Sequence, residues 1–381
     1  MPRDLSVAEG ELIEADNRFA LKLFREINRL EGDTNIFISP LSVAMALGMT
    51  LNGAAGSTEQ AMLQTLELQG LTREAVNESY RTLIDLLRNL DPNVEFLLAN
   101  SIWHAQNRVP AQEFLDIIQQ YFDAEVAALN FGDPSAAQTI NDWVYSNTNG
   151  KIEEIIENGI PANVIMYLIN AVYFKGDWTY QFDKNRTQDS DFTLVDGSKT
   201  TVDMMSQEGE IAIRSTSRDG MMIAELPYSG DAYCMTILLP DADGNVSSVV
   251  ENLTVDNWNA WIGNLIDNEM HVSLPKFTLE FELALNDALK ALGMEVAFNA
   301  GQADFTRMYP GGGVWIDTVL HKTFVEVNEE GTEAAAVTSV SMRELAAPSS
   351  LTVNRPFVFL IRERFSGTIL FMGKVMNPNA G

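Results

Sequence analysis

The sequence has a single cysteine, Cys234, and only three histidines, His104, His271 and His321. One cysteine excludes an intramolecular disulfide framework, and its place in the apolar run "YCMTILLP" indicates a small buried side chain. Without paired cysteines or an H-E-x-x-H motif, the sequence predicts neither a metal site nor a cofactor. It also has no G-x-S-x-G motif and no P-loop, so it offers no catalytic residue and disfavours a conventional enzyme.

Long apolar runs and basic residues are also scarce. The longest apolar run, "VIMYLINAVYF" over 164–174, is shorter than the ~20 residues that span a bilayer and contains Asn170, so it predicts a buried strand. Lys and Arg total 25 against 53 acidic residues, which gives a net charge of −28 and argues against nucleic acid or a membrane as a partner. The N-terminus lacks the apolar core of a signal peptide. The protein is therefore expected in the cytoplasm or, if a leader was removed, outside the cell or in its envelope.

The order of helical and strand patterns predicts an α+β fold. Apolar residues recur at helical spacing over Asn17–Leu30, and Ser39 before Pro40 caps a second helix. Further helices are predicted in "NESYRTLIDLLRNL", "AAQTINDWVYSNT" and "LNDALKALGM". From "VIMYLINAVYF" onward, β-branched and aromatic runs predominate, and the last of them predicts a hairpin turning at Ser366-Gly367. Because no linker or repeat divides the two halves, we expect one domain over 1–381.

The segment 327–350, "VNEEGTEAAAVTSVSMRELAAPSS", has the composition of a surface loop but alternates like a strand. As a strand it would have one uncharged face and one face that carries both charges. The uncharged face consists of Thr332, Ala334, Ala336, Thr338, Val340 and Met342, and the other of Glu333, Ala335, Val337, Ser339, Ser341 and Arg343. Small residues after Gly331 would let the strand enter a crowded sheet without overpacking. A flexible loop that happens to alternate is the alternative interpretation.

The motifs around this segment resemble those of the serpins, and the resemblance covers nearly the whole chain. They are "NIFISPLSVAMALGMTLNGAAGST", "INAVYFKGDW", "LPKFTLEFELALNDALKALGM", "VLHKTFVEVNEEGTEAAA" and "RPFVFLIRERFSGTILFMGKV", in the serpin order. The resemblance implies the serpin fold, with a large central, mostly antiparallel β-sheet, further sheets, surrounding helices and an exposed reactive-centre loop at about 329–353. It implies a monomeric inhibitor of the prokaryotic kind, not an enzyme. Its partners would be serine proteases, and some cysteine proteases, trapped as a covalent acyl-enzyme complex when the cleaved loop inserts into the sheet.

The resemblance also implies roles for particular residues. The family spacing puts the residue before the cut fourteen positions after Gly331 and eleven before Pro356, and both counts give the bond Leu345–Ala346, with Arg343 as an alternative bait. Leucine there suits chymotrypsin-, elastase- or subtilisin-like proteases. The other positions are the hinge residues Glu329, Gly331, Thr332, Ala334, Ala335 and Ala336, the shutter residues Ser39, Ser42, Asn170 and His321, and the breach residues Trp178 and Lys276. We expect a buried hydrogen-bond network at the shutter, and at the breach a packed Trp178 and a Lys276–Glu329 ion pair.

Two other functions remain as alternatives. A non-inhibitory serpin, acting as a carrier, chaperone or storage protein, would be expected to have bulky or charged residues on the inward face of the hinge, which Thr332, Ala334 and Ala336 are not. A conventional hydrolase would need a triad built from scattered residues, and no motif supports one. Heparin activation is disfavoured, because the helix that is basic in some serpins has only Arg81 and Arg88 among acidic residues.

Overall fold

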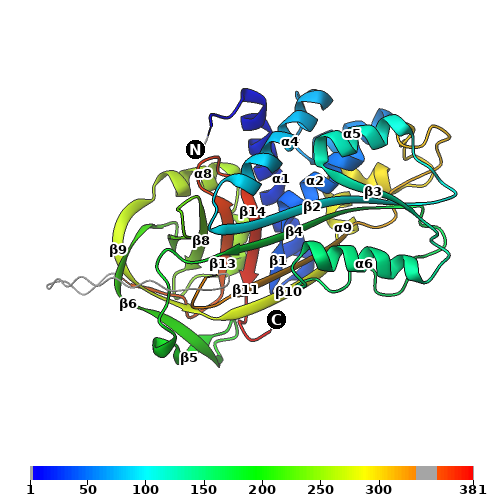
Figure 1. Ribbon diagram of the computed structural model, residues 1–381. Helices are drawn as coiled ribbons and strands as arrows, with labels where there is room; N and C mark the ends of the chain where they lie inside the picture. Colours follow the sequence, from blue (N-terminus) through cyan, green and yellow to red (C-terminus); the bar gives the residue numbers. More distant parts are fainter. Residues whose placement is uncertain (1–2, 332–349, 381) are drawn as a thin grey trace.

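The computed structural model describes residues 3–331 and 350–380 (Figure 1). The helices are α1 Val7–Glu31, α2 Pro40–Leu51, α3 Gly56–Thr65, α4 Arg73–Asn89, α5 Gln112–Phe122, α6 Ser135–Asn147, α7 Val246–Glu251, α8 Val255–Gly263 and α9 Asn286–Leu289, with shorter turns η1 Lys184–Arg186, η2 Lys290–Met294 and η3 Glu295–Phe298. The strands are β1 Ile36–Ile38, β2 Val94–Ala105, β3 Ala124–Leu129, β4 Met166–Gly176, β5 Gln188–Thr193, β6 Lys199–Arg218, β7 Met221–Pro227, β8 Tyr233–Pro240, β9 Ile266–Pro275, β10 Phe277–Ala284, β11 Leu320–Val327, β12 Ser350–Thr352, β13 Phe357–Glu363 and β14 Ile369–Val375. No described helix is long and apolar enough to cross a membrane.

The helices begin and end where capping residues satisfy their free backbone groups. Ser39 caps α2 by accepting a hydrogen bond from the Ser42 backbone, as the sequence predicted. α1 is longer than the predicted helix, because Ser6 and Glu9 form a capping box that starts it at Val7. Gly32 ends α1 with a φ of 61°.

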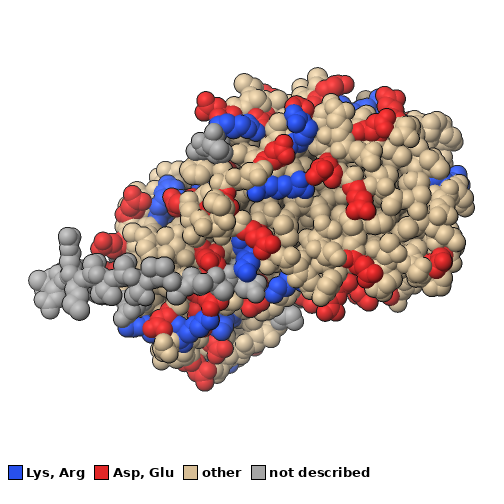
Figure 2. All heavy atoms as spheres, in the orientation of Figure 1, with Lys and Arg blue, Asp and Glu red and all other residues tan. Residues whose placement is uncertain are grey.

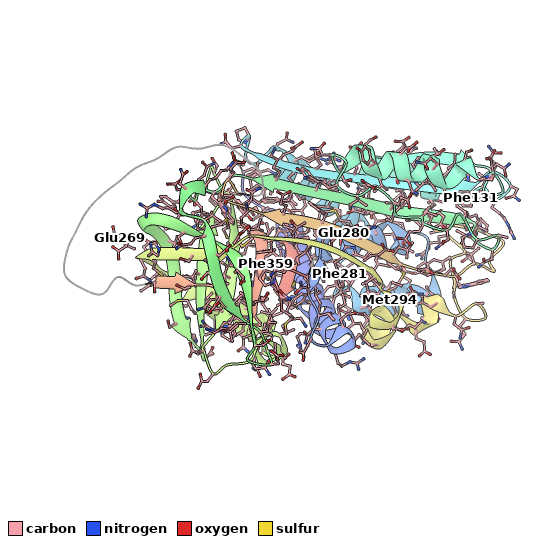
Figure 3. The ribbon with its side chains drawn as sticks, turned by 90° about the horizontal axis from the view of Figure 1, so that it is seen from below. Phe131, Glu269, Glu280, Phe281, Met294 and Phe359 are labelled. Atoms are coloured by element: carbon pink, nitrogen blue, oxygen red, sulfur yellow. The ribbon has the colours of Figure 1, made fainter. Side chains whose placement is uncertain are left out.

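The largest sheet has nine strands in the order β1-β14-β13-β8-β7-β6-β9-β12, with β5 added beside β6. The predicted C-terminal hairpin is confirmed as β13 and β14, and Phe359 of β13 lies in the core between the layers (Figure 3). "MHVSLPKFTLEF", read as one strand-rich run, is split between β9 of this sheet and β10 of another. The split occurs at Lys276, whose N–H still donates to Asp203 O of β6, whereas the next residue, Phe277, pairs with Val327 of β11.

Two smaller sheets, β3-β2-β4 and β10-β11, lie side by side and form the central sheet of the molecule. Within the described chain, β4 forms a ladder only with β2, and β11 only with β10. α6 covers the outer face of β2 and β4, where Ile140 and Val144 pack on Trp103 and Ile169. The predicted α+β fold is confirmed, and its central sheet is divided between β4 and β11.

Candidate functional site

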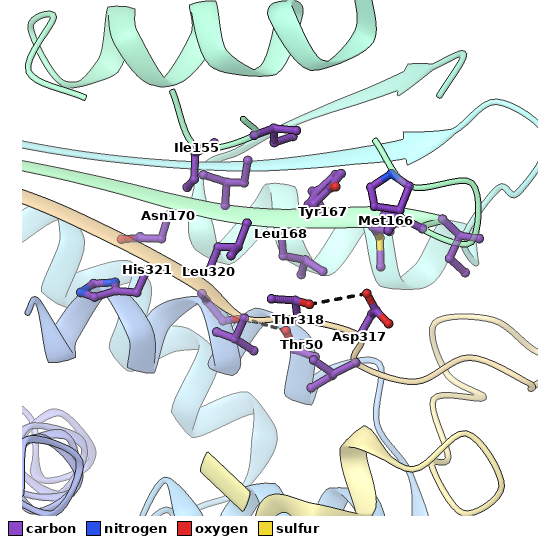
Figure 4. Close-up of a pocket in the computed structure, with 18 of the residues that line it drawn as sticks. Thr50, Ile155, Met166, Tyr167, Leu168, Asn170, Asp317, Thr318, Leu320 and His321 are labelled. Atoms are coloured by element: carbon purple, nitrogen blue, oxygen red, sulfur yellow. Dashed lines mark hydrogen bonds between the residues drawn. The ribbon is translucent and has the colours of Figure 1, made fainter. Parts of the chain in front are cut away.

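A cavity of about 530 Å³ separates the first halves of β4 and β11. Residues 166–171 of β4 and 320–322 of β11 line its sides, α2 lies behind it, and parts of the connection 152–165 cover it. Figure 4 shows Asn170 and Leu168 on one strand facing His321 and Leu320 on the other. Among the described residues each strand uses only its outer edge for a ladder, so the inner edges could pair with a further strand.

Beyond the cavity, the ends of β4 and β11 are joined through Gly331. The Asn328 N–H donates to Gly331 O at 3.1 Å and the Gly331 N–H to Asn328 O at 3.3 Å, which is the closing pair of an antiparallel hairpin with a two-residue turn. On its other side, Gly331 forms an antiparallel bridge with Asp177, and the Trp178 N–H donates to Glu330 O at 3.0 Å. One residue of a strand between β4 and β11 is thus already in place.

The position of Gly331 admits no side chain. Its φ is 143°, a value that L residues rarely adopt. A Cβ atom there would lie 2.4 Å from Gly176 O and 2.5 Å from the Asp177 Cα. The chain can therefore enter between the strand ends only with glycine at this point.

Trp178 and Glu329 anchor this entry point. The indole of Trp178 is buried, stacks on Tyr228 with ring centroids 4.6 Å apart, and donates from Nε1 to Asn328 O at 3.0 Å. The Glu329 carboxyl is also buried, 3.1 Å from Lys276 Nζ, and accepts a 2.7 Å hydrogen bond from Thr187 Oγ1. Burial alone would raise the pKa of Glu329, but the hydrogen bonds from Thr187, from the backbone and from Lys276 together outweigh it and lower the pKa below its usual value. The ionised carboxylate thus fixes the turn that precedes Gly331.

Ser39 and His321 join α2 to β11 beside the cavity. The Ser39 backbone N–H donates to His321 Nε2 at 3.0 Å, and Ser39 Oγ donates to Leu370 O at 2.9 Å. Burial lowers the pKa of His321 to about 4, so the ring is neutral at pH 7 and Nε2 is free to accept. The ring therefore serves as a hydrogen-bond acceptor at the start of α2.

Ser42 and Asn170 join the same helix to β4. Ser42 Oγ donates to the backbone oxygen of Asn170 at 3.3 Å, and the Asn170 amide donates to Asn100 Oδ1 at 2.6 Å. Asn100, which sequence reasoning missed, donates in turn to Phe122 O at 2.7 Å. In the described chain the buried Asn170 Oδ1 has no hydrogen-bond partner. Both sides of the cavity are therefore tied to α2, and one polar atom between them is left unpaired.

The predicted site residues thus fall at two places along one division of the sheet. Trp178, Lys276, Glu329 and Gly331 lie together at the joined end, and Ser39, Ser42, Asn170 and His321 lie beside the cavity. Thr332, Ala334, Ala335, Ala336, Arg343, Leu345 and Ala346 lie outside the described residues. The sequence reasoning missed Asn328 and Asp177, which hold Gly331, although an Asn three residues before a Gly is a turn signal.

The described residues form no catalytic triad around a histidine. The rings of His104, His271 and His321 make hydrogen bonds to the backbone of Ala105, Gly209 and Ser39, respectively. No group of three or more His, Cys, Asp or Glu side chains in the described chain converges as a metal site.

Acidic side chains are spread over the visible face, with basic ones interspersed (Figure 2). On α4, Arg81 pairs with Glu78, and Arg88 lies 2.9 Å from Asp123. These arginines are engaged in local pairs rather than gathered into a basic patch. That heparin does not activate the protein stays a prediction.

Comparison with known proteins identifies relatives over nearly the full chain. A family model described as "Serpin (serine protease inhibitor)" matches residues 14–378. Human leukocyte elastase inhibitor is 35% identical, with 97% of this chain and 100% of that protein covered. Human serpin B11 is 32% identical with the same coverage.

Solved structures share the fold. The native-state crystal structure of tengpin, a thermophilic serpin, matches with a TM-score of 0.86 at 32% identity and covers 98% of this chain and 95% of tengpin. Human thyroxine-binding globulin matches with a TM-score of 0.88 at 28% identity and covers 98% of this chain and all of that chain. The similar proteins thus include one named as an elastase inhibitor and one named for the binding of thyroxine.

Proposed function

The chain belongs to the serpin family, and we propose that it inhibits serine proteases as a suicide substrate. The bait is the bond Leu345–Ala346 in a reactive-centre loop at about 329–353. The protease serine attacks the Leu345 carbonyl, the amine of Ala346 leaves, and Leu345 remains bound as an ester. The loop then enters the central sheet between β4 and β11, and the protease moves with it before water completes hydrolysis.

The observation that carries this proposal is the position of Gly331, which pairs with Asp177 on one side and with Asn328 on the other. Extending the Asn328–Gly331 hairpin pairs Thr332 with Val327, and extending the Asp177 bridge pairs it with Gly176. Val327, Val325 and Thr323 are buried, so the same register would turn the uncharged face of the loop inward. The same two registers would pair Thr338 with His321 on β11 and with Asn170 on β4. A threonine hydroxyl there could donate to Asn170 Oδ1, which has no partner in the described chain.

The gain from insertion is large enough to trap an enzyme. About ten new ladder hydrogen bonds at ~0.5–1.5 kcal/mol each, together with apolar burial, amount to about 10 kcal/mol or more. That is comparable with the whole stability of an ordinary protein, so it can distort an active site. Fourteen residues at ~3.3 Å each would carry Leu345 about 45 Å from Gly331, to the far end of the cavity.

The side chain of Leu345 selects the protease class. An apolar side chain fits the primary pocket of chymotrypsin- and subtilisin-like enzymes and of elastases with a roomy pocket. The similarity to leukocyte elastase inhibitor supports this choice. Arg343 offers a trypsin-like alternative, but cleavage there would shorten the inserted strand by two residues.

The second candidate is a non-inhibitory serpin that carries a ligand. The structural match to thyroxine-binding globulin favours it. The inward face of the hinge favours inhibition instead, because Thr332, Ala334 and Ala336 are small and uncharged and could be buried at little cost.

Incubation with chymotrypsin, pancreatic elastase, subtilisin and trypsin, followed by denaturing electrophoresis, separates the two. An inhibitor gives a band at the summed mass that withstands SDS, because the ester bond persists. A carrier gives only the cleaved chain. An active-site serine-to-alanine protease is the control, since it binds the loop but cannot acylate.

A further inference from the structure

Two carboxyl side chains are buried on α1, and their surroundings differ. Glu9 is 5% exposed and Asp16 is 4% exposed. Glu9 accepts hydrogen bonds from Arg3 Nη1 at 2.9 Å and from the Ser6 backbone at 2.7 Å. Asp16 Oδ1 accepts a hydrogen bond from the Tyr80 hydroxyl of α4 at 2.9 Å, and Asp16 Oδ2 has no partner in the described chain. One of the two buried carboxyls is thus bound to a cation, and the other is bound to a neutral phenol.

Tyr80 lies where three other helices pack against α4. These helices are α1, α2 and α5 (Figure 1). The Tyr80 ring is fully buried, and its centroid lies 5.5 Å from that of Phe122 on α5. It also lies so close to Gly48 of α2 that a Cβ added there would be 2.8 Å from Tyr80 Cε2. The hydroxyl therefore has little room to move away from Asp16, and the pair joins α1 to α4 inside the core.

The elements packed against α1 provide no charged partner for Asp16 among the described residues. On α1 itself, Arg18 pairs with Glu14 and Glu67. α2 and β1 contain no titratable residue. Apart from Tyr80, the titratable side chains of the other elements are exposed or bound to other groups. They are Arg73, Glu74, Glu78, Arg81, Asp85 and Arg88 of α4, Glu251 of α7, Asp256 of α8, Asp287 of α9, Lys290 of η2 and Lys374 of β14.

These surroundings set the protonation of the pair. Burial raises the pKa of Asp16 from 3.8 to about 7, because the hydrogen bond from Tyr80 does not offset the lost hydration. Burial acts on Glu9 in the same direction, but hydrogen bonds from Arg3 and other neighbours outweigh it and lower the pKa to about 2. Burial and the Asp16 carboxylate raise the pKa of Tyr80 well above 10, so its hydroxyl stays a donor. An unpaired oxygen costs more in the core when it is charged than when it is neutral.

We propose that Asp16 and Tyr80 form a proton-dependent contact between α1 and α4, which is stable while Asp16 is protonated and weakens when Asp16 ionises. The contact makes the packing of these helices respond to pH. It concerns the intact chain and does not depend on protease inhibition. Because the folded pKa of Asp16 is raised, its contribution to stability is fully present below pH 3.8 and is lost as the pH rises to about 7.

The test compares denaturant unfolding of the parent and of Asp16→Asn between pH 5.5 and 8.5. An asparagine amide accepts a hydrogen bond from the Tyr80 hydroxyl and stays uncharged, so it reproduces the neutral carboxyl. The unfolding constant of the parent, divided by that of the variant, should rise about tenfold per pH unit up to pH 7 and stay level above it. His321 titrates with the opposite sign, but it is present in both proteins and cancels from this ratio.

Glu9→Gln is the matched control, because Glu9 is as buried as Asp16 and lies on the same helix. Its pKa of about 2 keeps Glu9 ionised over the whole range, so the corresponding ratio should not change with pH. A ratio for Asp16→Asn that is equally independent of pH would overturn the inference.

Tyr80→Phe tests the hydrogen bond itself and gives a second test if Asp16→Asn does not fold. Since the bond from Tyr80 lowers the pKa of Asp16, its loss should raise that pKa further. The stability of Tyr80→Phe should therefore keep falling above pH 7, where that of the parent has levelled off with respect to Asp16. A difference between Tyr80→Phe and the parent that stays constant from pH 5.5 to 8.5 would mean that Tyr80 does not act on the proton of Asp16, and the proposed contact would be wrong.

Discussion

At the residue scale, Gly331 is the position that should tolerate a side chain least. Replacing it with alanine should weaken the closure between β4 and β11, because a Cβ would lie 2.4 Å from Gly176 O and the φ of 143° suits only glycine. We expect a loss of about 1–3 kcal/mol, measured as a lower midpoint of denaturant unfolding.

Gly197→Ala is the control for this variant. Gly197 also has a positive φ, 81°, but a Cβ added there would have nothing within 4 Å. Equal effects of the two substitutions would mean that backbone strain alone, and not contact with β4, restricts Gly331.

The residue before the cut should set specificity without affecting trapping. Leu345→Arg should redirect the protein to trypsin-like enzymes, whose pocket carries a carboxylate. The association rate with chymotrypsin should fall by orders of magnitude, since its apolar pocket would bury an unpaired charge. Both rates are measured from progress curves of protease activity.

Mass spectrometry of the released C-terminal peptide checks where the cut occurs. The peptide should begin at Ala346 in both the parent and Leu345→Arg. A parent peptide that begins at Glu344 would identify Arg343 as the bait instead.

Single residues could be located from the sequence where a motif fixed their surroundings. The motifs placed Glu329 and Lys276 in one pair, and they lie 3.1 Å apart. They did not indicate Thr187 or Asn100, which bind Glu329 and Asn170, because these partners are distant in sequence and carry no pattern of their own. Side-chain partners of this kind emerge only from the folded chain.

At the element scale, the junction of α2 with β11 should make stability depend on pH. His321 has a folded pKa of about 4 against an ordinary 6.5, so below pH 6.5 the unfolded chain binds a proton that the native one does not. The neutral His321 ring therefore contributes to the free energy of unfolding above pH 6.5. This contribution, about 3 kcal/mol in total, is lost as the pH falls to 4. Denaturant midpoints between pH 7.5 and 4.5 measure the loss.

His321→Gln separates this effect from the titration of the many carboxylates. A glutamine amide oxygen can accept the Ser39 N–H but takes up no proton in this range. The variant should therefore be less sensitive to acid than the parent. Parallel pH curves for the two proteins would contradict a role for His321.

If the loop inserts as a strand, a charge on its inward face should hinder insertion. Thr332→Arg would place a charge opposite the buried Val327, at a cost of several kcal/mol unless it is paired. Insertion should slow, so that deacylation of the acyl-enzyme becomes faster than insertion. Cleaved protein should then accumulate on denaturing gels. Thr332→Ser is the matched control, because it changes the same position but keeps the side chain small and uncharged. An unchanged stoichiometry of inhibition in Thr332→Arg, the moles of inhibitor consumed per mole of protease trapped, would show that the assigned faces are wrong.

Elements with strong local signals were predicted well. The cap of α2 and the hairpin of β13 and β14 followed from Ser39-Pro40 and Ser366-Gly367. The start of α1 was missed, because the capping box at Ser6 and Glu9 that sets it was not recognised in the sequence. The division between β4 and β11 could not be predicted, because which strand edges pair is decided by contacts between distant segments.

At the scale of the whole molecule, we propose that the native state is not the most stable arrangement of the chain, because its central sheet is divided. β4 and β11 each have an inner edge without a ladder in the described chain, and a cavity of about 530 Å³ lies between them. Unpaired edges and unfilled space both cost free energy. On the proposed mechanism, the chain between Gly331 and β12 fills this space only after it is cut, and we propose that a kinetic barrier holds the native form until then.

Cleavage of the bond Leu345–Ala346 frees the loop from β12 and should release this stored energy. The loop can then pair with both inner edges, and about 10 kcal/mol of added hydrogen bonding and burial should raise the melting temperature by about 10 °C or more. The measurement is a thermal scan of the intact protein and of the protein cleaved by a protease that it does not trap. Cleaved Thr332→Arg should gain less, because its first inward residue resists burial. A cleaved protein that melts at the temperature of the intact one would mean that the space between β4 and β11 is not filled by the loop.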